Sequence, residues 1–98
     1  MKVRFSRVAS VQLNEILEFI AEESPRTAAL VATRVETLVS LLARRPDVGR
    51  PTKIGDVKVF RAAPYPYLIF YRIDATGDHV TVIRVRHTAR GDDWREGR

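Results

Sequence analysis

Two runs of helically spaced apolar residues, with almost nothing between them, constrain the fold of this chain most. The first run extends from about Ala9 to Glu23, and the second ends near Arg44-Arg45-Pro46. Between them stand Ser24 and Pro25, an N-cap residue followed by the residue that suits the first helical position. The sequence therefore predicts an antiparallel helical hairpin. Its apolar stripes are Ala9, Leu13, Ile16, Leu17 and Ile20, then Ala28, Val31, Val35, Leu38 and Leu42.

Strand patterns lie on both sides of this hairpin. Val3 and Phe5 alternate with polar neighbours, which predicts a short first strand. After a turn-rich connector, 46–51, three further strand signals follow at 57–62, 67–71 and 80–85. The order β-α-α-β-β-β predicts an α+β fold in which the hairpin packs on one face of an antiparallel sheet. We expect a single domain over residues 1–98, with 88–98 forming a polar tail that frays.

Composition excludes several classes of site. The 98 residues contain no cysteine, so a disulfide or a Cys-based metal site is impossible. The two histidines are too few for a typical zinc site. No glycine-rich phosphate loop and no cluster of metal ligands occurs, so no cofactor and no metal are expected. No apolar run approaches the roughly 20 residues that cross a bilayer, and no signal peptide is recognisable, so a cytoplasmic protein without membrane contact is expected.

The net charge of +5 is unevenly distributed, because acids concentrate in the first helix and arginines accumulate late. Alternation along the last strand predicts that Thr81, Ile83, Val85 and His87 meet the helices, and that Arg84 and Arg86 lie on the bare face of the sheet. Arg61 could reach that same face. Either these arginines form a cationic surface for a partner, or they are a solvated outer face paired with nearby acids.

Four strings, in this order, carry a resemblance to a known family that covers about residues 3 to 94. They are the opening helix 9–20, the segment 46–50 as P-x-x-G-R, the strand 66–72 as P-Y-x-I-x-Y-R, and the strand end 85–90 as V-x-H-x-x-R. Together they resemble ParE-type toxins of the RelE/ParE toxin–antitoxin superfamily. The resemblance implies a toxin that binds and inhibits DNA gyrase. It also implies a ParD-like cognate antitoxin whose acidic amphipathic C-terminal segment wraps over the toxin.

This reading assigns residues to two surfaces and expects no sequence-specific nucleic acid binding. The expected target-binding residues are Arg61, Arg84, Arg86, Arg90 and Trp94. The expected antitoxin-binding residues are Leu13, Leu17, Phe19, Ile20, Val35 and Leu38, although a wide core stripe is the simpler explanation for these apolar side chains.

A ribosome-dependent mRNA endonuclease of the RelE type is the alternative, since it shares the expected fold. His87 would then be the general base, and Arg84 and Arg61 would supply charge for the phosphate. The resemblance implies a tyrosine or similar group near the C-terminal strand as the matching acid, and no tyrosine follows Tyr71. Packing or hydrogen bonding of His87 at the strand end is therefore the favoured interpretation, and an enzyme is the less favoured class. A basic module without toxicity is a third possibility.

Overall fold

The predicted helical hairpin is present in the computed structural model, which describes residues 1–90. Each helix begins at a serine whose hydroxyl oxygen accepts a bond from a backbone N–H three residues on: Ala9 to Ser6 at 3.0 Å, and Thr27 to Ser24 at 3.1 Å. These bonds satisfy N–H groups that have no partner inside a helix. The helices are α1 (Arg7–Glu23) and α2 (Pro25–Arg44).

The strands form one sheet of five in the order β1-β5-β4-β3-β2. Their bounds are β1 (Lys2–Phe5), β2 (Arg50–Pro51), β3 (Lys58–Arg61), β4 (Tyr67–Ile73) and β5 (His79–His87), followed by the 3₁₀ turn η1 (Thr88–Arg90). The α+β class and the predicted order of elements are confirmed. The sheet is mixed rather than wholly antiparallel, because β1 pairs in parallel with β5. The connector also contributes a short strand, β2, which the sequence pattern did not predict.

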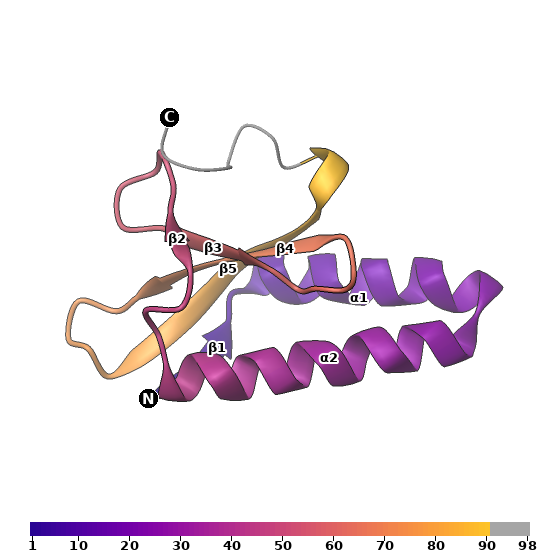
Figure 1. Cartoon of the computed structure of the whole chain (residues 1–98), viewed down its shortest axis with the longest axis horizontal. Helices are drawn as coiled ribbons and strands as arrows, with labels where there is room; N and C mark the ends of the chain where they lie inside the picture. The colour runs from indigo at the N-terminus through magenta and orange to yellow at the C-terminus, as the bar shows by residue number, and fades with distance from the viewer. Residues whose placement is uncertain (91–98) are drawn as a thin grey trace.

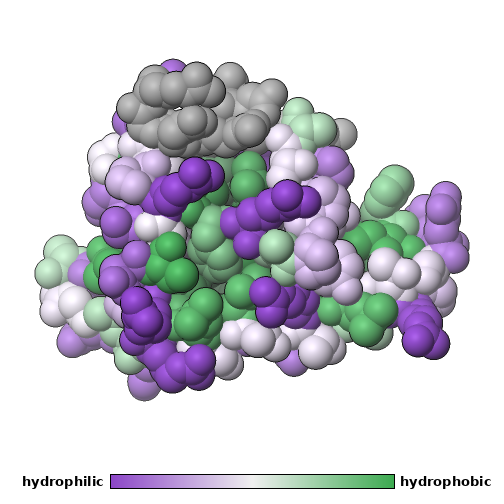
Figure 2. Space-filling view, in the orientation of Figure 1, coloured by the Kyte–Doolittle hydropathy of each residue, from purple (hydrophilic) through white to green (hydrophobic). Residues whose placement is uncertain are grey.

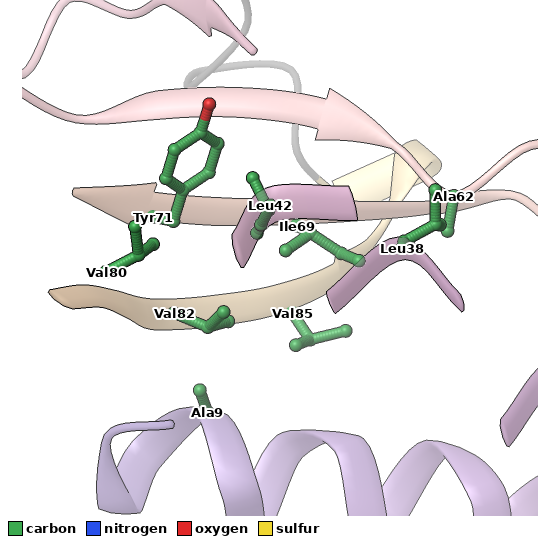
Figure 3. Packing of buried hydrophobic residues seen from close by; sticks show 9 residues of the cluster. All are labelled: Ala9, Leu38, Leu42, Ala62, Ile69, Tyr71, Val80, Val82 and Val85. Carbon is green, nitrogen blue, oxygen red and sulfur yellow. The ribbon is translucent and has the colours of Figure 1, made fainter. Parts of the chain in front are cut away.

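The main core lies between the helical hairpin and one face of the sheet (Figure 1). Leu38 and Leu42 from α2 and Ala9 from α1 pack there against buried residues of β4 and β5 (Figure 3). Ala9 and Leu42 are completely buried. The tip of the hairpin extends past the sheet (Figure 1), and the molecule measures 40 × 28 × 23 Å.

A β-bulge in β5 makes the predicted faces wrong for the first part of that strand, whereas Val85 meets the helices and Arg84 and Arg86 lie on the opposite face, as predicted. Phe70 pairs with Arg84, whereas the next residue, Tyr71, pairs with Val82, so Ile83 is the extra residue. Val80, Val82 and Val85 consequently belong to the core beneath the helices, whereas Ile83 packs on the opposite face. Simple alternation predicted that Val80 and Val82 lie on the face opposite to Val85. This was wrong because the extra residue reverses the face of every side chain on its far side.

The second face of the sheet is not bare, which corrects another expectation. Val57, Val59, Leu68 and Phe70 form a buried apolar cluster there, with Ile83 packed against it. Phe70 is completely buried. On the face seen in Figure 2, apolar side chains also gather in the middle of the molecule, with hydrophilic side chains around them. The second face therefore carries a buried apolar cluster rather than an uninterrupted polar surface.

Tyr71 attaches the connector to the sheet. Its hydroxyl donates to the carbonyl oxygen of Pro46 at 2.7 Å and accepts from the backbone N–H of Gly49 at 2.8 Å. The ring lies edge-on to Phe60, with centroids 5.9 Å apart. These contacts join the P-x-x-G string to the second tyrosine of the P-Y-x-I-x-Y string. Gly49 and Tyr71 are 22 residues apart in sequence, and together the two motifs hold the connector against the sheet.

The buried tyrosine predicts a loss of stability in alkali. Desolvation raises the pKa of Tyr71 above its ordinary value, and the nearby Asp47 carboxylate adds to the shift, although the Gly49 N–H opposes it. A raised folded-state pKa means that the neutral phenol stabilises the fold fully below pH ~10 and that this contribution is lost as the pH rises further. Urea unfolding of the wild type and of Tyr71→Phe between pH 8 and 11 should show a steeper alkaline decline in the wild type. Parallel pH profiles would contradict this expectation.

Candidate functional site

A cleft of about 500 Å³ lies between α1 and the second half of β5. Phe19, on the rim, is the most exposed large apolar residue in the described part of the chain, with 74% of its surface accessible. The lining residues are Gln12, Glu15, Ile16, Phe19, Tyr67, Arg84, Val85, Arg86 and His87. The cleft therefore combines an apolar wall with cationic and hydrogen-bonding groups, a composition that suits a protein segment or another polar polymer.

The position of this cleft follows from the chain's local order. β1 ends at Phe5, and α1 begins two residues later, at Arg7. β5 continues to His87, so its second half extends past the end of β1. The last register pair between β1 and β5 is Phe5 with Val82. Beyond that pair, α1 approaches the strand instead, and the Gln12 side-chain oxygen accepts a bond from the Val85 N–H at 2.8 Å.

His87 lies at the end of the cleft, with its ring bonded to its own strand end. Its Nδ1 accepts a hydrogen bond from the Ala89 backbone N–H at 3.0 Å, and its ring meets Tyr67 edge-on at a centroid distance of 5.5 Å. An acceptor at Nδ1 assigns the proton of the neutral ring to Nε2. The one nitrogen lone pair that the neutral ring could use as a base, on Nδ1, thus already accepts the Ala89 N–H. His87 could remove a proton from a substrate only after this hydrogen bond is broken.

The arginines that the sequence grouped together share one face of the sheet but line two different depressions. Arg84 and Arg86 line the cleft, whereas Arg61 lies in a different depression with Arg50. Arg61 and Arg86 share one row across the sheet, since both pair with Leu68, so their backbones are two strand spacings, or ~10 Å, apart. The exposed Arg61 donates through Nε to the Tyr65 carbonyl oxygen at 3.3 Å. Trp94 and the side chain of Arg90 lie outside the described residues.

The residues expected to bind an antitoxin also occupy different environments. Leu13, Leu17 and Val35 line an apolar groove of about 460 Å³ between the two helices and Phe5. Phe19 faces the cleft, and Ile20 is half-buried. Leu38 belongs to the main core and is not among the residues that line this groove.

The far end of β5 carries a separate polar cluster in the β4–β5 turn. Asp74 accepts bonds from the hydroxyl and backbone N–H of Thr76, which lower the pKa of its carboxyl, and His79 and Arg4 contribute smaller effects in the same direction. His79 Nε2 lies 3.7 Å from Asp74 Oδ1. These contacts shape the turn, and none of these residues lines the cleft.

Sequence reasoning missed three cleft residues. Gln12 gave no signal, because its partner lies 73 residues away. Glu15 counted only among the acids of the first helix, and Tyr67 only as part of the strand at 67–71. Among residues 1–90, no group of three or more His, Cys, Asp or Glu side chains is arranged to hold a metal ion. In the same range, neither helix has the length and apolarity that crossing a bilayer requires.

Three solved structures that share this fold come from toxins or toxin–antitoxin systems. A chain described as "Chromosomal ParDE TA system from P. aeruginosa" superposes with a TM-score of 0.74 at 19% identity, over 89% of this chain and 95% of that one. A "YoeB/ParE toxin from Agrobacterium tumefaciens" gives a TM-score of 0.60 at 17% identity, over 89% and 98%. A chain of the toxin–antitoxin complex RelBE2 from Mycobacterium tuberculosis gives 0.59 at 29% identity, over 88% of both chains.

The fold is thus that of the ParE/RelE toxin superfamily, and the sequence match agrees with it. The family model described as "ParE toxin of type II toxin-antitoxin system, parDE" matches residues 3–91, so the chain belongs to the ParE toxin family. The curated protein Y4kP of Sinorhizobium fredii (strain NBRC 101917 / NGR234) is 35% identical over 82 residues, which are 84% of this chain and 85% of that protein.

Proposed function

We propose that this ParE-family toxin acts by binding DNA gyrase directly and is neutralised by a cognate ParD-like antitoxin. We favour target binding over RNA cleavage because the Ala89 N–H donates a hydrogen bond to His87 Nδ1. A metal-free cleavage of RNA needs a base with an available lone pair beside the 2′-hydroxyl. In the neutral ring of His87, that lone pair already accepts a backbone hydrogen bond.

One observation favours the ribonuclease alternative. The cleft brings Glu15, Tyr67 and His87 together beside Arg84 and Arg86, so acidic, phenolic and cationic groups converge at one place. An exposed carboxylate can act as a base, and guanidinium groups stabilise a phosphate that gains charge. The two functions therefore need separate assays.

We place the proposed target contact on the second face of the sheet. Arg61 is exposed there, Arg86 lies in the same row, and the buried cluster around Leu68 and Phe70 forms a rigid floor between strands. The proposed antitoxin contact uses the hairpin groove with Leu13, Leu17 and Val35, and continues over Phe19 and Ile20. An acidic segment that extends from the groove into the cleft would reach Arg86, because the cleft joins the helical side to the arginine row.

Purified toxin is expected to inhibit DNA supercoiling by gyrase, and Arg61→Ala should weaken that inhibition by about 3- to 30-fold in the half-inhibitory concentration. The factor corresponds to the loss of ~0.5–2 kcal/mol from a charged contact at an interface. The measurement is a supercoiling titration on relaxed plasmid. Arg26→Ala is the matched control, since Arg26 is also exposed but lies in the first turn of α2, at the tip of the hairpin.

Unimpaired supercoiling at a large excess of folded toxin would refute the gyrase proposal. The same toxin preparation is then added to a translation reaction, and the mRNA is mapped by primer extension. Cuts in the mRNA that disappear in His87→Ala or Glu15→Gln would establish the ribonuclease alternative in its place.

A further inference from the structure

We propose that the second face of the sheet binds the phosphate backbone of duplex DNA without reading its sequence. The side chains that make this contact are four arginines of β2, β3 and β5, namely Arg50, Arg61, Arg84 and Arg86. The inference deepens the gyrase proposal and rests on it for the choice of DNA, because gyrase acts on duplex DNA. The contact itself needs no gyrase, so it can be measured with the toxin alone.

The register of the sheet places all four side chains on one face. Residues that pair between neighbouring strands point to the same side of a sheet. Phe70 and Leu68 belong to the buried cluster of the second face, so their partners point to that face too. Two neighbouring rows result, which read Arg50, Val59, Phe70 and Arg84, and then Arg61, Leu68 and Arg86. Each row therefore has an arginine at both of its ends.

The two rows form a four-cornered surface with an arginine at each corner. The rows lie two residues, or ~7 Å, apart along the strands, and they span two and three strand spacings, or ~10 and ~14 Å. Arg50 and Arg61 are exposed, whereas Arg84 and Arg86 are half-buried. Over ~10–14 Å of its axis, a DNA duplex carries about six to eight phosphates. The phosphates on the side that faces the sheet are thus about as many as the arginines.

The strands provide cations without acids. In the part of the chain that the structure describes, none of the five strands contains Asp or Glu. The nearest ion pair on this face is at the other end of β4, where Arg72 Nε lies 3.4 Å from Asp56 Oδ1. Among residues 1–90, no ion pair neutralises Arg50, Arg61 or Arg86. Such a concentration of one charge attracts a polyanion.

The same face is poorly suited to single strands and to base edges. Proteins bind single strands by stacking bases on exposed aromatic rings. Phe70 is completely buried, and the other aromatic residues of the described strands pack on the opposite face, namely Phe5, Phe60, Tyr67 and Tyr71. A face ~14 Å wide is also broader than the ~12 Å major groove. The guanidinium groups therefore meet phosphates, which they can bind through two parallel hydrogen bonds.

Fluorescence anisotropy of a labelled duplex of roughly 20 base pairs, titrated with full-length toxin, tests this contact. Two duplexes of unrelated sequence should bind within about threefold of each other, because phosphate contacts carry no sequence information. The logarithm of the binding constant should fall linearly with the logarithm of the salt concentration. Its slope should be about −3 to −4, as four neutralised phosphates require.

Single substitutions assign the binding to this face. Arg61→Ala and Arg86→Ala should each weaken binding by about 3- to 10-fold on both duplexes and make the salt slope shallower by about 1. Arg61→Lys should keep the slope, because it keeps the charge. It also shows whether the loss in Arg61→Ala comes from the charge or from the bond to the Tyr65 carbonyl oxygen. Arg26→Ala is the matched control, since it removes the same charge at the tip of the hairpin. It should leave the slope unchanged.

Several results would overturn the inference. Toxin that does not bind the duplex at low salt, or an equal loss in Arg26→Ala, would show that this face is not a DNA site. Tighter binding of a single strand or of duplex RNA would assign the face to another nucleic acid. A preference of about 1,000-fold or more for one duplex would mean that bases are read.

The supercoiling assay separates this inference from the gyrase proposal. If the toxin inhibits gyrase but does not bind DNA by itself, the DNA contact is wrong and the gyrase proposal stands. If the toxin binds DNA through the four arginines but leaves supercoiling unimpaired, the gyrase proposal is wrong and the DNA contact stands.

Discussion

Replacing Leu42 with alanine is expected to lower the free energy of unfolding by about 2–5 kcal/mol. Leu42 is completely buried in the core between the hairpin and the sheet. Truncation would remove apolar contacts and leave a cavity, which the surrounding β4 and β5 residues can fill only in part. Domains of this size are commonly stable by ~5–15 kcal/mol, so the loss is a large share of the total.

Thermal and urea unfolding, followed by circular dichroism, measure this effect. The midpoint temperature should fall by about 10 °C or more, since ~1 kcal/mol corresponds to ~4–8 °C in domains of up to 100 residues. Phe19→Ala provides the comparison, because it removes a larger apolar side chain that is 74% exposed. Its cost should stay within ~0.5 kcal/mol. Equal costs for the two variants would contradict the assignment of Leu42 to the core and Phe19 to the surface.

A second large effect is expected from Gly49→Ala, which should destabilise the protein by about 2–4 kcal/mol. A Cβ atom at this position would lie 2.7 Å from the Tyr71 hydroxyl oxygen and 2.8 Å from Cε1 of the same ring. The ring is buried between strands and cannot simply move away. Overpacking of this kind costs ~1–3 kcal/mol, and disturbing the two hydroxyl hydrogen bonds adds roughly 1 kcal/mol more.

A double-mutant cycle with Tyr71→Phe isolates this contact. Removing the hydroxyl loses the bonds to Pro46 and Gly49 but also relieves the shortest collision. The double variant should therefore cost less than the sum of the two single variants, by about 1 kcal/mol. Gly77→Ala is the comparison for backbone strain alone, since its φ is +77° and a Cβ there meets nothing within 4 Å. Additive costs in the cycle would show that Gly49 and Tyr71 do not act through each other.

Local signals made the helical hairpin predictable. Ser24 and Pro25 are adjacent in sequence, and the bonds that cap both helices span only three residues. The strands at 57–62 and 67–71 were predictable for the same reason, because alternation and apolar runs are properties of short segments. Val57 and Val59 pack on one side of the sheet and Phe60 and Ala62 on the other, as alternation along 57–62 requires.

Features that depend on distant pairings were not predictable. The bulge at Ile83 arises from how β5 fits β4, and it alone reversed the predicted faces of Val80 and Val82. The buried patch on the second face needs side chains from three strands. For the cleft, the sequence identified His87, Arg84 and Arg86 as neighbours, because they are close along the chain. It could not show that Arg61 lies outside the cleft or that Gln12 reaches Val85.

The parallel pairing of β1 with β5 has a consequence for biosynthesis. Arg4 bonds through Nε with the Thr81 hydroxyl, its neighbour on the last strand, although 77 residues separate the two. A ribosome that adds ~5–20 residues per second needs about 4–15 s to make that stretch. Until then, the N-terminal segment has no native partner strand to join. The nascent polypeptide therefore cannot complete its five-stranded sheet until β5 has been synthesised.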